Sequence, residues 1–250
     1  MEIIMKTNNP DDSIRQDQIK LHLNHRFSPI GRLLDQWKRF QGLFSWQAIH
    51  IFNTLVKRGM DITGSIIFLI LFSPIYFVTV LAILIEDGRP IFYNQIRVAR
   101  HGRRFKMYKF RSMYRDADKR KADLESDAMT GGVIFKMKND PRITRTGRII
   151  RKLSIDELPQ LWNVLVGDLS LVGPRPPLPA EVAEYSGWDR KRLDITPGLT
   201  CTWQVSGRSD IDFENQVKLD IDYIKHRSIL ADMILLLKTI PAVMSGKGAY

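Results

Sequence analysis

Cysteine is almost missing from this 250-residue sequence, in which Cys201 is the one cysteine. A single thiol excludes an intrachain disulfide framework, and no CxxC pair or cysteine–histidine cluster suggests zinc. The five histidines are scattered, which argues against a histidine-rich metal centre. The sequence also lacks the P-loop and the GxGxxG fingerprint, so the common phosphate-binding glycine loops are excluded.

Acidic residues are too few to balance the basic ones. The chain has 38 Lys+Arg against 27 Asp+Glu, a formal net charge of +11. This excess indicates anionic partners, such as nucleic acid, anionic lipid or phosphorylated small molecules. With 44% hydrophobic and 26% charged residues, the composition is neither that of a disordered nor that of a fibrous protein.

One long segment, residues 62–85, contains no charge at all and lies between Asp61 and Glu86. A straight helix of this length would measure about 36 Å, and a bilayer core is about 30 Å thick. The segment begins too late for a secretory signal peptide, and residues 1–30 have no apolar run of their own. Because fully buried soluble helices are seldom this long, we predict a membrane-inserted segment.

Ser73-Pro74 interrupts the apolar segment near its middle. Proline removes a backbone hydrogen bond and clashes with the Ile70 carbonyl, and the Ser73 hydroxyl can bond the carbonyl of Leu69 and add to the bend. Each half is then too short to span a bilayer. Basic residues flank both ends, and the positive-inside rule favours the cytoplasmic side for both. A re-entrant helix–break–helix satisfies these features, and so does a kinked single span with an outside N-terminus.

These features divide the chain into three predicted parts. Residues 1–32 form a polar, flexible extension, residues 33–88 an interfacial helix followed by the broken membrane helix, and residues 89–250 a cytoplasmic catalytic domain. The stretch 33–56 mixes aromatic and basic residues. It fits an amphipathic helix in the headgroup region, or equally a surface helix packed on its own domain.

The predicted fold class is α+β, a re-entrant membrane hairpin followed by a compact mixed domain with interfacial amphipathic helices. Residues 90–98 and 105–113 have the pattern of two short strands joined by a turn, and residues 211–244 that of two helices. Seven Lys/Arg and no acid lie between Arg97 and Arg111, with aromatic residues interleaved. Alone this could be a nucleic-acid patch, but beside a membrane segment it indicates lipid headgroups or a phosphorylated ligand.

Two adjacent carboxylates, Asp156 and Glu157, lie in the most informative stretch. With Pro159 in the first helical turn, Asp156 would cap a helix and Glu157 would complement its dipole, a purely structural role. Basic residues precede the pair, however, and Gly173–Pro176 follows it. Carboxylates that face arginines offer a nucleophile, a metal ligand and cations for phosphate oxygens. The prolines around Arg175 either present its guanidinium rigidly or form a turn only.

Several short motifs occur in order along the chain: Lys109–Met113, Asp140–Arg142, Asp156–Leu161, Gly173–Pro176, Pro197–Thr200 and Trp203–Arg208. Together with the Ser73-Pro74 break they resemble the bacterial monotopic phosphoglycosyl transferases, the sugar transferases that start exopolysaccharide and O-antigen assembly. The resemblance covers about residues 50–250. It implies that the broken helix is re-entrant.

The resemblance also implies a reaction at the cytoplasmic face of the bacterial inner membrane. A sugar-1-phosphate would move from a UDP-sugar to polyprenyl (undecaprenyl) phosphate, with release of UMP. The family uses Mg²⁺ and a covalent aspartyl–phosphosugar intermediate, which makes Asp156 the expected nucleophile and Glu157, with Asp156, the expected Mg²⁺ ligands. The anion contacts that the resemblance implies are Arg151, Arg175, Lys109 and Arg111.

Other properties are less closely specified by the sequence. The C-terminal motifs are most similar to those of hexose transferases, so glucose or galactose is the expected sugar. We expect membrane lipid and no nucleic acid as partners, and the Leu- and Trp-rich helices would permit a homodimer. Two other functions fit parts of the sequence: a non-catalytic membrane-anchored binder of anionic ligands, and a UDP-sugar hydrolase.

Overall fold

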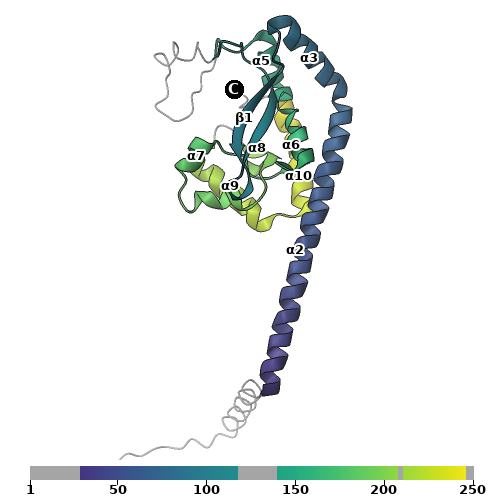
Figure 1. The fold of residues 1–250 in the computed structure, drawn as a ribbon, viewed down its shortest axis with the longest axis vertical. Helices are drawn as coiled ribbons and strands as arrows, with labels where there is room; N and C mark the ends of the chain where they lie inside the picture. The colour runs from purple at the N-terminus through teal and green to yellow at the C-terminus, as the bar shows by residue number, and fades with distance from the viewer. Residues whose placement is uncertain (1–28, 118–139, 208–210, 246–250) are drawn as a thin grey trace, which may run out of the picture. The chain divides into compact units, whose positions relative to one another are not determined.

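The computed structural model describes residues 29–117, 140–207 and 211–245 (Figure 1). The predicted extension over residues 1–32 lies almost entirely outside the described residues. Contacts divide the chain into two compact units, residues 1–55 and 56–250. The candidate site lies within the second unit.

The described part is mostly helical and contains two small sheets, a mixed α and β fold as expected. Its elements are α2 (Pro29–Leu71), α3 (Ser73–Asp87), β1 (Phe92–Val98), η1 (Arg100–Gly102), β2 (Arg104–Phe110), α5 (Arg145–Lys152), η3 (Ile155–Glu157), α6 (Gln160–Val166), β3 (Ser170–Val172), α7 (Pro179–Ala183), η4 (Asp189–Asp194), β4 (Gly198–Thr200), α8 (Thr202–Ser206), α9 (Phe213–His226) and α10 (Ile229–Ser245).

A sharp bend separates α2 from α3 at the predicted break. The two helices are bent by 59°, and Pro74 lies in the first turn of α3, where its missing N–H leaves no hydrogen bond unmade. The Ser73 hydroxyl donates to the carbonyl of Ile70 at 2.7 Å. The predicted acceptor, the carbonyl of Leu69, was wrong. The carbonyl of Ile70 is the one that would accept from residue 74 in a regular helix, and Pro74 has no N–H to donate to it.

Among the described helices, none is by itself both long and apolar enough to cross a membrane, whereas α2 from Ile51 and α3 reach that standard together. Large apolar side chains also remain exposed along the pair, which is unusual for a monomeric soluble protein. Those in the charge-free segment are Ile66, Ile67, Ile70, Leu71, Ile75, Phe77, Val78, Leu81 and Ile85.

Helix α2 is continuous over 43 residues. Residues 33–56, expected as an interfacial or a surface helix, are helical and form one helix with the first half of the apolar segment. Residues 57–61 connect the stretch 33–56 to the apolar segment, and they include Gly59 but no proline. One glycine destabilises a helix much less than a proline does, so α2 continues through this region.

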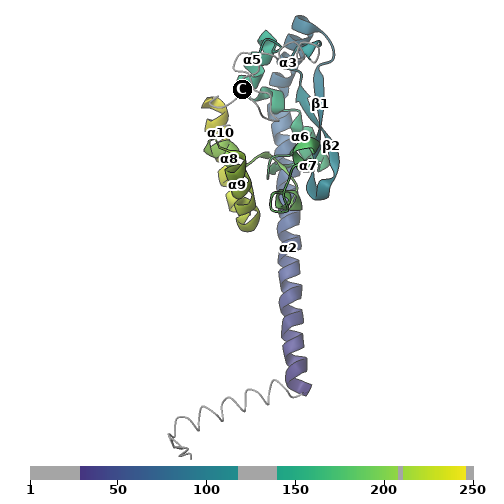
Figure 2. The ribbon, with the colours of Figure 1, turned by 90° about the vertical axis from the view of Figure 1, so that its left-hand side faces the viewer.

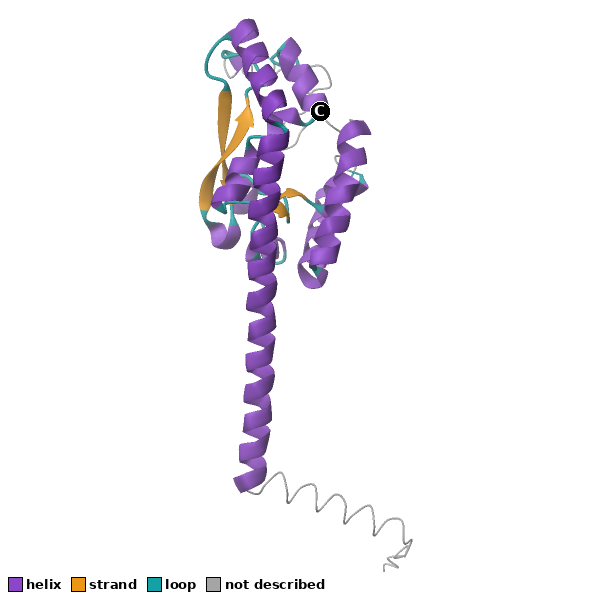
Figure 3. Ribbon diagram, turned by 90° about the vertical axis from the view of Figure 1, so that its right-hand side faces the viewer, coloured by secondary structure: helices purple, strands orange, loops and turns teal. Residues whose placement is uncertain are grey.

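The two predicted strands are confirmed as the antiparallel hairpin β1–β2, with Tyr93 opposite Lys109 and Arg97 opposite Phe105. A second, smaller sheet pairs β3 with β4 in parallel, as Figure 3 shows in orange. The two predicted C-terminal helices are also confirmed as α9 and α10, which lie beside α8 (Figure 2).

The apolar interior has two separate clusters, and each helix of the bent pair packs against a different one. The end of α2 packs against the larger cluster, built from β2, α6, β3, α9 and α10. Helix α3 contributes to the smaller one, in which Ile83, Phe110 and Ile150 are buried. The aromatic ring of Tyr76 meets that of Phe110 edge-on, with centroids 5.2 Å apart.

Candidate active site

Asp156 and Glu157 lie in the short 3₁₀ turn η3, between α5 and α6. Ser154 adopts a left-handed conformation, with φ of 55°, and turns the chain after α5. The expected cap was therefore wrong: α6 begins at Gln160, and Asp156 belongs to the separate turn that precedes it. Asp156 is buried and Glu157 is half-buried.

Lys109 of β2 contacts both carboxylates. Its Nζ lies 2.7 Å from Glu157 Oε1 and 3.8 Å from Asp156 Oδ2. Burial raises the pKa of Asp156 to about 6, against the charge of Lys109. Burial acts on Glu157 in the same direction, but the charge and hydrogen bond of Lys109 outweigh it and lower its pKa.

Two further predicted cations act on the same pair. The charge of Arg151 on α5 opposes the rise in the Asp156 pKa, and that of Arg175 contributes to the low pKa of Glu157. Arg175 is exposed, and its Cζ lies 5.8 Å from the ring centroid of Trp203, a cation–π contact. Lys109 thus contacts the acidic turn directly, whereas Arg151 and Arg175 act on it through their charge.

Arg111 has other partners. Its Nη2 lies 2.9 Å from Asp87 Oδ2 and donates to the carbonyls of Asp87 and Gly88, at 3.1 and 2.8 Å. Arg111 therefore fastens the end of α3 to β2. Its expected contact with a substrate anion stays a prediction.

Arg97 belongs to the site and was not among the predicted site residues. It is buried, it donates to the Pro176 carbonyl at 3.2 Å, and its charge acts on Glu157. Burial and repulsion from Arg175 lower the pKa of Arg97 to about 10. The available signal was an arginine immediately before Val98, the apolar residue that ends β1.

The loop that carries Arg175 is fixed by backbone hydrogen bonds on two sides. Val98 N donates to the Pro177 carbonyl at 3.0 Å, from the hairpin. On the other side Gly173 N donates to Thr200 O at 3.0 Å, and Gly198 N donates to Pro174 O at 2.8 Å. With three prolines in the loop as well, the backbone around Arg175 has little freedom.

Helix α3 is bonded to the structure on both sides of the acidic turn. The Tyr76 hydroxyl donates to the carbonyl of Leu158, directly after Glu157. The Glu86 carboxylate accepts from the backbone N–H groups of Arg145 and Thr146, at 2.7 and 2.8 Å, and so caps the N-terminus of α5. These bonds tie η3 and its neighbour α5 to the second helix of the bent pair.

The acidic turn has the donors that a loosely held Mg²⁺ needs. Within the described residues no group of three or more His, Cys, Asp and Glu could enclose a metal ion. Mg²⁺ commonly uses one or two carboxylates, and substrate phosphates and water complete its coordination. Asp156 and Glu157 fit that pattern, which makes them candidates for an ion that binds together with a phosphorylated substrate.

Comparison with known proteins identifies the family to which this chain belongs. The family model described as bacterial sugar transferase matches residues 52–246. The chain belongs to the bacterial sugar transferase family. The matched residues include α2 from residue 52 onward, all of α3, the acidic turn and the Arg175 loop, so the whole candidate site lies inside the family's domain.

Individual members of the sugar transferase family are closely similar. The galactosyl transferase CpsE of Streptococcus agalactiae is 47% identical over 79% of this chain and 44% of its own length. The undecaprenyl-phosphate galactose phosphotransferase of Salmonella typhimurium is 43% identical over 79% and 42%. The exopolysaccharide production protein ExoY of Rhizobium meliloti is 37% identical over 81% and 92%. The chain thus spans less than half of the first two relatives and most of the third.

The predicted family is thereby confirmed. The roles of Asp156, Glu157, Arg151, Arg175, Lys109 and Arg111, and the requirement for Mg²⁺, stay predictions.

Proposed function

We propose that this chain transfers galactose-1-phosphate, or another hexose-1-phosphate, from a UDP-sugar to undecaprenyl phosphate and so initiates exopolysaccharide assembly. The names of the CpsE and Salmonella relatives support galactose, and the latter's name supports the lipid acceptor. The observation that carries the proposal is the pair Asp156–Glu157, which Lys109 contacts and which is followed by Leu158, the residue whose carbonyl accepts a hydrogen bond from Tyr76 of α3.

The reaction would occur in two balanced displacements. A carboxylate oxygen of Asp156 attacks the sugar-bearing phosphorus of the donor, the phosphoanhydride bond breaks, and UMP leaves with the bridging oxygen and its electron pair. A phosphate oxygen of undecaprenyl phosphate then attacks the same phosphorus. The bond to Asp156 breaks, the carboxylate is restored, and the product is an undecaprenyl diphosphate sugar.

The cations would make this attack feasible. Asp156 and the donor diphosphate repel one another, and opposite charges at short range offset that repulsion. Lys109 is in place beside both carboxylates, and Arg175 is exposed on a rigid loop where it can hold phosphate oxygens. Bound Mg²⁺, held by Glu157 and Asp156, would supply further neutralisation of the diphosphate.

The bent pair would place the site at the cytoplasmic surface of the inner membrane. The acceptor phosphate is fixed at headgroup depth by its hydrocarbon tail, whereas the donor is soluble. A re-entrant α2–α3 hairpin, with its exposed apolar face in lipid, would hold Asp156 at that depth. Helix α10 also exposes a run of apolar side chains that would lie on the same surface: Leu230, Met233, Ile234, Leu237, Ile240 and Met244.

The sharpest test is the variant Asp156→Asn, assayed in reconstituted membranes with UDP-galactose, undecaprenyl phosphate and Mg²⁺. Loss of the nucleophile should lower UMP release and lipid-linked galactose by about 10³-fold or more. Asp222→Asn, which changes an exposed aspartate of α9, is the matched control and should retain wild-type rates. Wild-type turnover by Asp156→Asn would remove the proposed nucleophile.

A second experiment tests the covalent route. Donor and Mg²⁺ without acceptor should leave a sugar-phosphate adduct that peptide mapping assigns to Asp156, and chelation of Mg²⁺ should prevent it. Undecaprenyl phosphate should then discharge the adduct to lipid. Release of free sugar phosphate at the same rate with or without the acceptor would instead identify a hydrolase.

Membrane topology can be tested with two matched cysteines in a Cys201→Ser background. Gly59 and Gly187 both have open space around an added side chain. If the hairpin is re-entrant, Gly59→Cys and Gly187→Cys should both resist a membrane-impermeant maleimide in intact spheroplasts and react after lysis. Reaction of Gly59→Cys alone in intact spheroplasts would establish a single span instead.

A further inference from the structure

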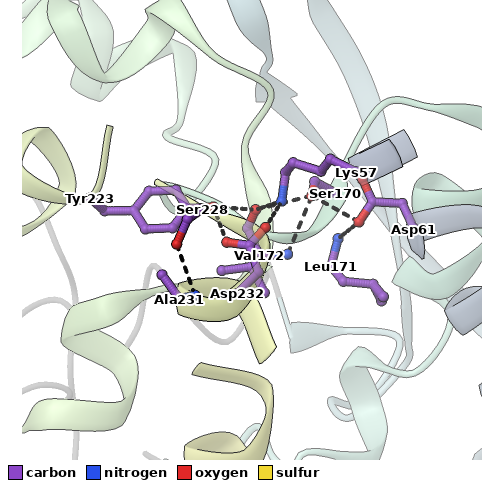
Figure 4. A network of polar contacts seen from close by, with 9 residues as sticks. All are labelled: Lys57, Asp61, Ser170, Leu171, Val172, Tyr223, Ser228, Ala231 and Asp232. Carbon is purple, nitrogen blue, oxygen red and sulfur yellow. Dashed lines mark hydrogen bonds and ion pairs between the residues drawn. The ribbon is translucent and has the colours of Figure 1, made fainter. Parts of the chain in front are cut away.

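Two charged side chains of α2, Lys57 and Asp61, reach into the protein and bind the strand β3 (Figure 4). Asp61 Oδ1 accepts hydrogen bonds from Leu171 N at 2.9 Å and from Ser170 Oγ at 3.0 Å. Lys57 Nζ donates to the Val172 carbonyl at 3.1 Å. Every residue of this short strand is therefore bonded to a side chain of α2.

The same network includes a second buried carboxylate. Lys57 Nζ lies 2.5 Å from Asp232 Oδ2 of α10, and the Tyr223 hydroxyl donates to Asp232 Oδ1 at 2.6 Å. Asp61 and Asp232 are 6% and 5% exposed. Burying charge is expensive, and apolar replacements of buried ion pairs are often neutral or stabilising. Overall stability is therefore a poor explanation for this network, whereas fixing one particular geometry is a better one.

The strand that these side chains hold leads directly into the Arg175 loop. Only Gly173 and Pro174 separate Val172 from Arg175. Gly198 of β4 packs so closely on Gly173 that an added Cβ would lie 2.0 Å from the Gly173 nitrogen. Because the intervening residues can absorb little movement, a displacement of β3 must displace Arg175 as well.

We infer that Asp61 and Lys57 are positioning residues for Arg175, which they hold against Glu157 and the donor diphosphate by fixing β3. The inference rests on the proposed function, since that is what assigns Arg175 to the donor. It also gives the bent pair a part in substrate binding, because the helix that holds the phosphate-binding loop is the one that continues into the apolar segment.

A double-mutant cycle between Asp61 and Arg175 tests this inference. Asp61→Ala should raise the KM for UDP-galactose about tenfold, with a much smaller change in kcat and in the KM for undecaprenyl phosphate. In an Arg175→Ala background, the same change should raise the donor KM by less than about twofold, because the group that Asp61 positions is already missing. Equal effects in the two backgrounds would overturn the inference.

Two conservative variants separate positioning from a general loss of structure. Asp61→Asn keeps an acceptor oxygen for Leu171 N and Ser170 Oγ, so it should restore most of the donor affinity. Ser65→Ala removes another buried polar group of α2, which bonds the Ile62 carbonyl within the helix. It should lower the thermal midpoint without a change in donor KM, and a KM rise equal to that of Asp61→Ala would contradict the inference.

The outcomes also distinguish this inference from the proposed function. If the wild-type protein releases no UMP from UDP-galactose or another UDP-hexose, the proposed function fails. If wild type and Arg175→Ala behave as expected but the Asp61 and Arg175 effects add, the inference alone fails. Should Asp61→Ala not fold, Ser170→Ala enters the same cycle, because it removes the hydroxyl that bonds both Asp61 and the Val172 carbonyl.

Discussion

The two helices of the bent pair hold different parts of the site, and they do so through different partners. From residue 56 onward, α2 binds the protein through charge, with Lys57 and Asp61 on β3 and with Arg58 on the end of α6. Helix α3 uses the Tyr76 hydroxyl beside the acidic turn, an aromatic contact with Phe110, and a carboxylate cap on α5. The two helices also pack on separate apolar clusters.

This difference shows how the bent pair can position the parts of the candidate site without contributing a reacting group of its own. The strand that leads to Arg175 is fastened to α2, and the turn that carries Asp156 is fastened to α3. The 59° bend between these helices is therefore linked to the spacing between the phosphate-holding cation and the nucleophile of the proposed reaction.

The largest expected effect is a loss of stability from a substitution in α5, the helix that Glu86 of α3 caps. A Cβ added at Gly147 would lie 1.9 Å from the backbone oxygen of Ser112, which cannot easily move. Gly147→Ala should therefore lower the free energy of unfolding by about 3 kcal/mol or more, measured as a fall in the thermal midpoint in detergent. Gly187→Ala, at an open position, is the control. Equal midpoints for the two variants would contradict the expectation.

Arg58→Met tests the charged side of the comparison. Arg58 donates to the carbonyls of Val164 and Leu165, both at 2.7 Å, and so caps the C-terminal end of α6. Its loss should lower the free energy of unfolding by about 2 kcal/mol. Because none of the hydrogen bonds of Arg58 given above goes to β3, the donor KM should remain at the wild-type value. A rise in donor KM like that of Asp61→Ala would contradict the proposal that Lys57 and Asp61 act on Arg175 through β3. Lys218→Met, on an exposed pair, is the control.

Tyr76→Phe isolates one hydrogen bond on the α3 side, because phenylalanine keeps the ring contact with Phe110. The lost bond to Leu158 should lower the free energy of unfolding by about 1 kcal/mol. If α3 positions the acidic turn, kcat should fall several-fold with the donor KM unchanged, the reverse of the Asp61→Ala pattern. Tyr93→Phe, at an exposed tyrosine, should change neither constant. A rise in donor KM with unchanged kcat would count against the assignment.

The smallest expected effect compares two glycines of α2. Gly59 has open space, so Gly59→Ala should stabilise the protein by about 0.5–1 kcal/mol through helix propensity. At Gly64 an added Cβ would lie 2.7 Å from Leu171 Cδ1 on β3. That side chain must shift, which should cancel the gain, and unfolding in detergent measures both variants. Equal stabilisation by both would mean that α2 has more room against β3 than its contacts indicate.

Features with local causes could be predicted from the sequence. The break follows from proline chemistry at Pro74, the hairpin from two short strand patterns, and the C-terminal helices from apolar periodicity. The acidic pair and the family were predicted from short motifs that occur in a fixed order along the chain. The flanking prolines of Arg175 are visible in the sequence, and they predicted either a rigidly presented guanidinium or a turn only.

Features that depend on distant contacts could not be predicted. Asp61 bonds Leu171 across 110 positions, and nothing near either residue indicates the other. Lys57 and Arg58 were counted only as flanking charges for topology, although both bind carbonyls inside the protein. A charged residue beside an apolar segment can face the membrane surface or can bind groups inside the protein, and tertiary packing decides between these two roles. The 3₁₀ turn at Asp156 was missed because it depends on the left-handed Ser154, a conformation that serine seldom adopts.

The ion pair between Lys57 and Asp232 also has a consequence for how the protein is made. Its partners are 175 positions apart in the chain. A ribosome therefore releases the α2 ammonium long before it synthesises the carboxylate that neutralises it. Until α10 emerges, the Lys57 ammonium beside β3 lacks its carboxylate partner, so this polar network can be completed only late in translation.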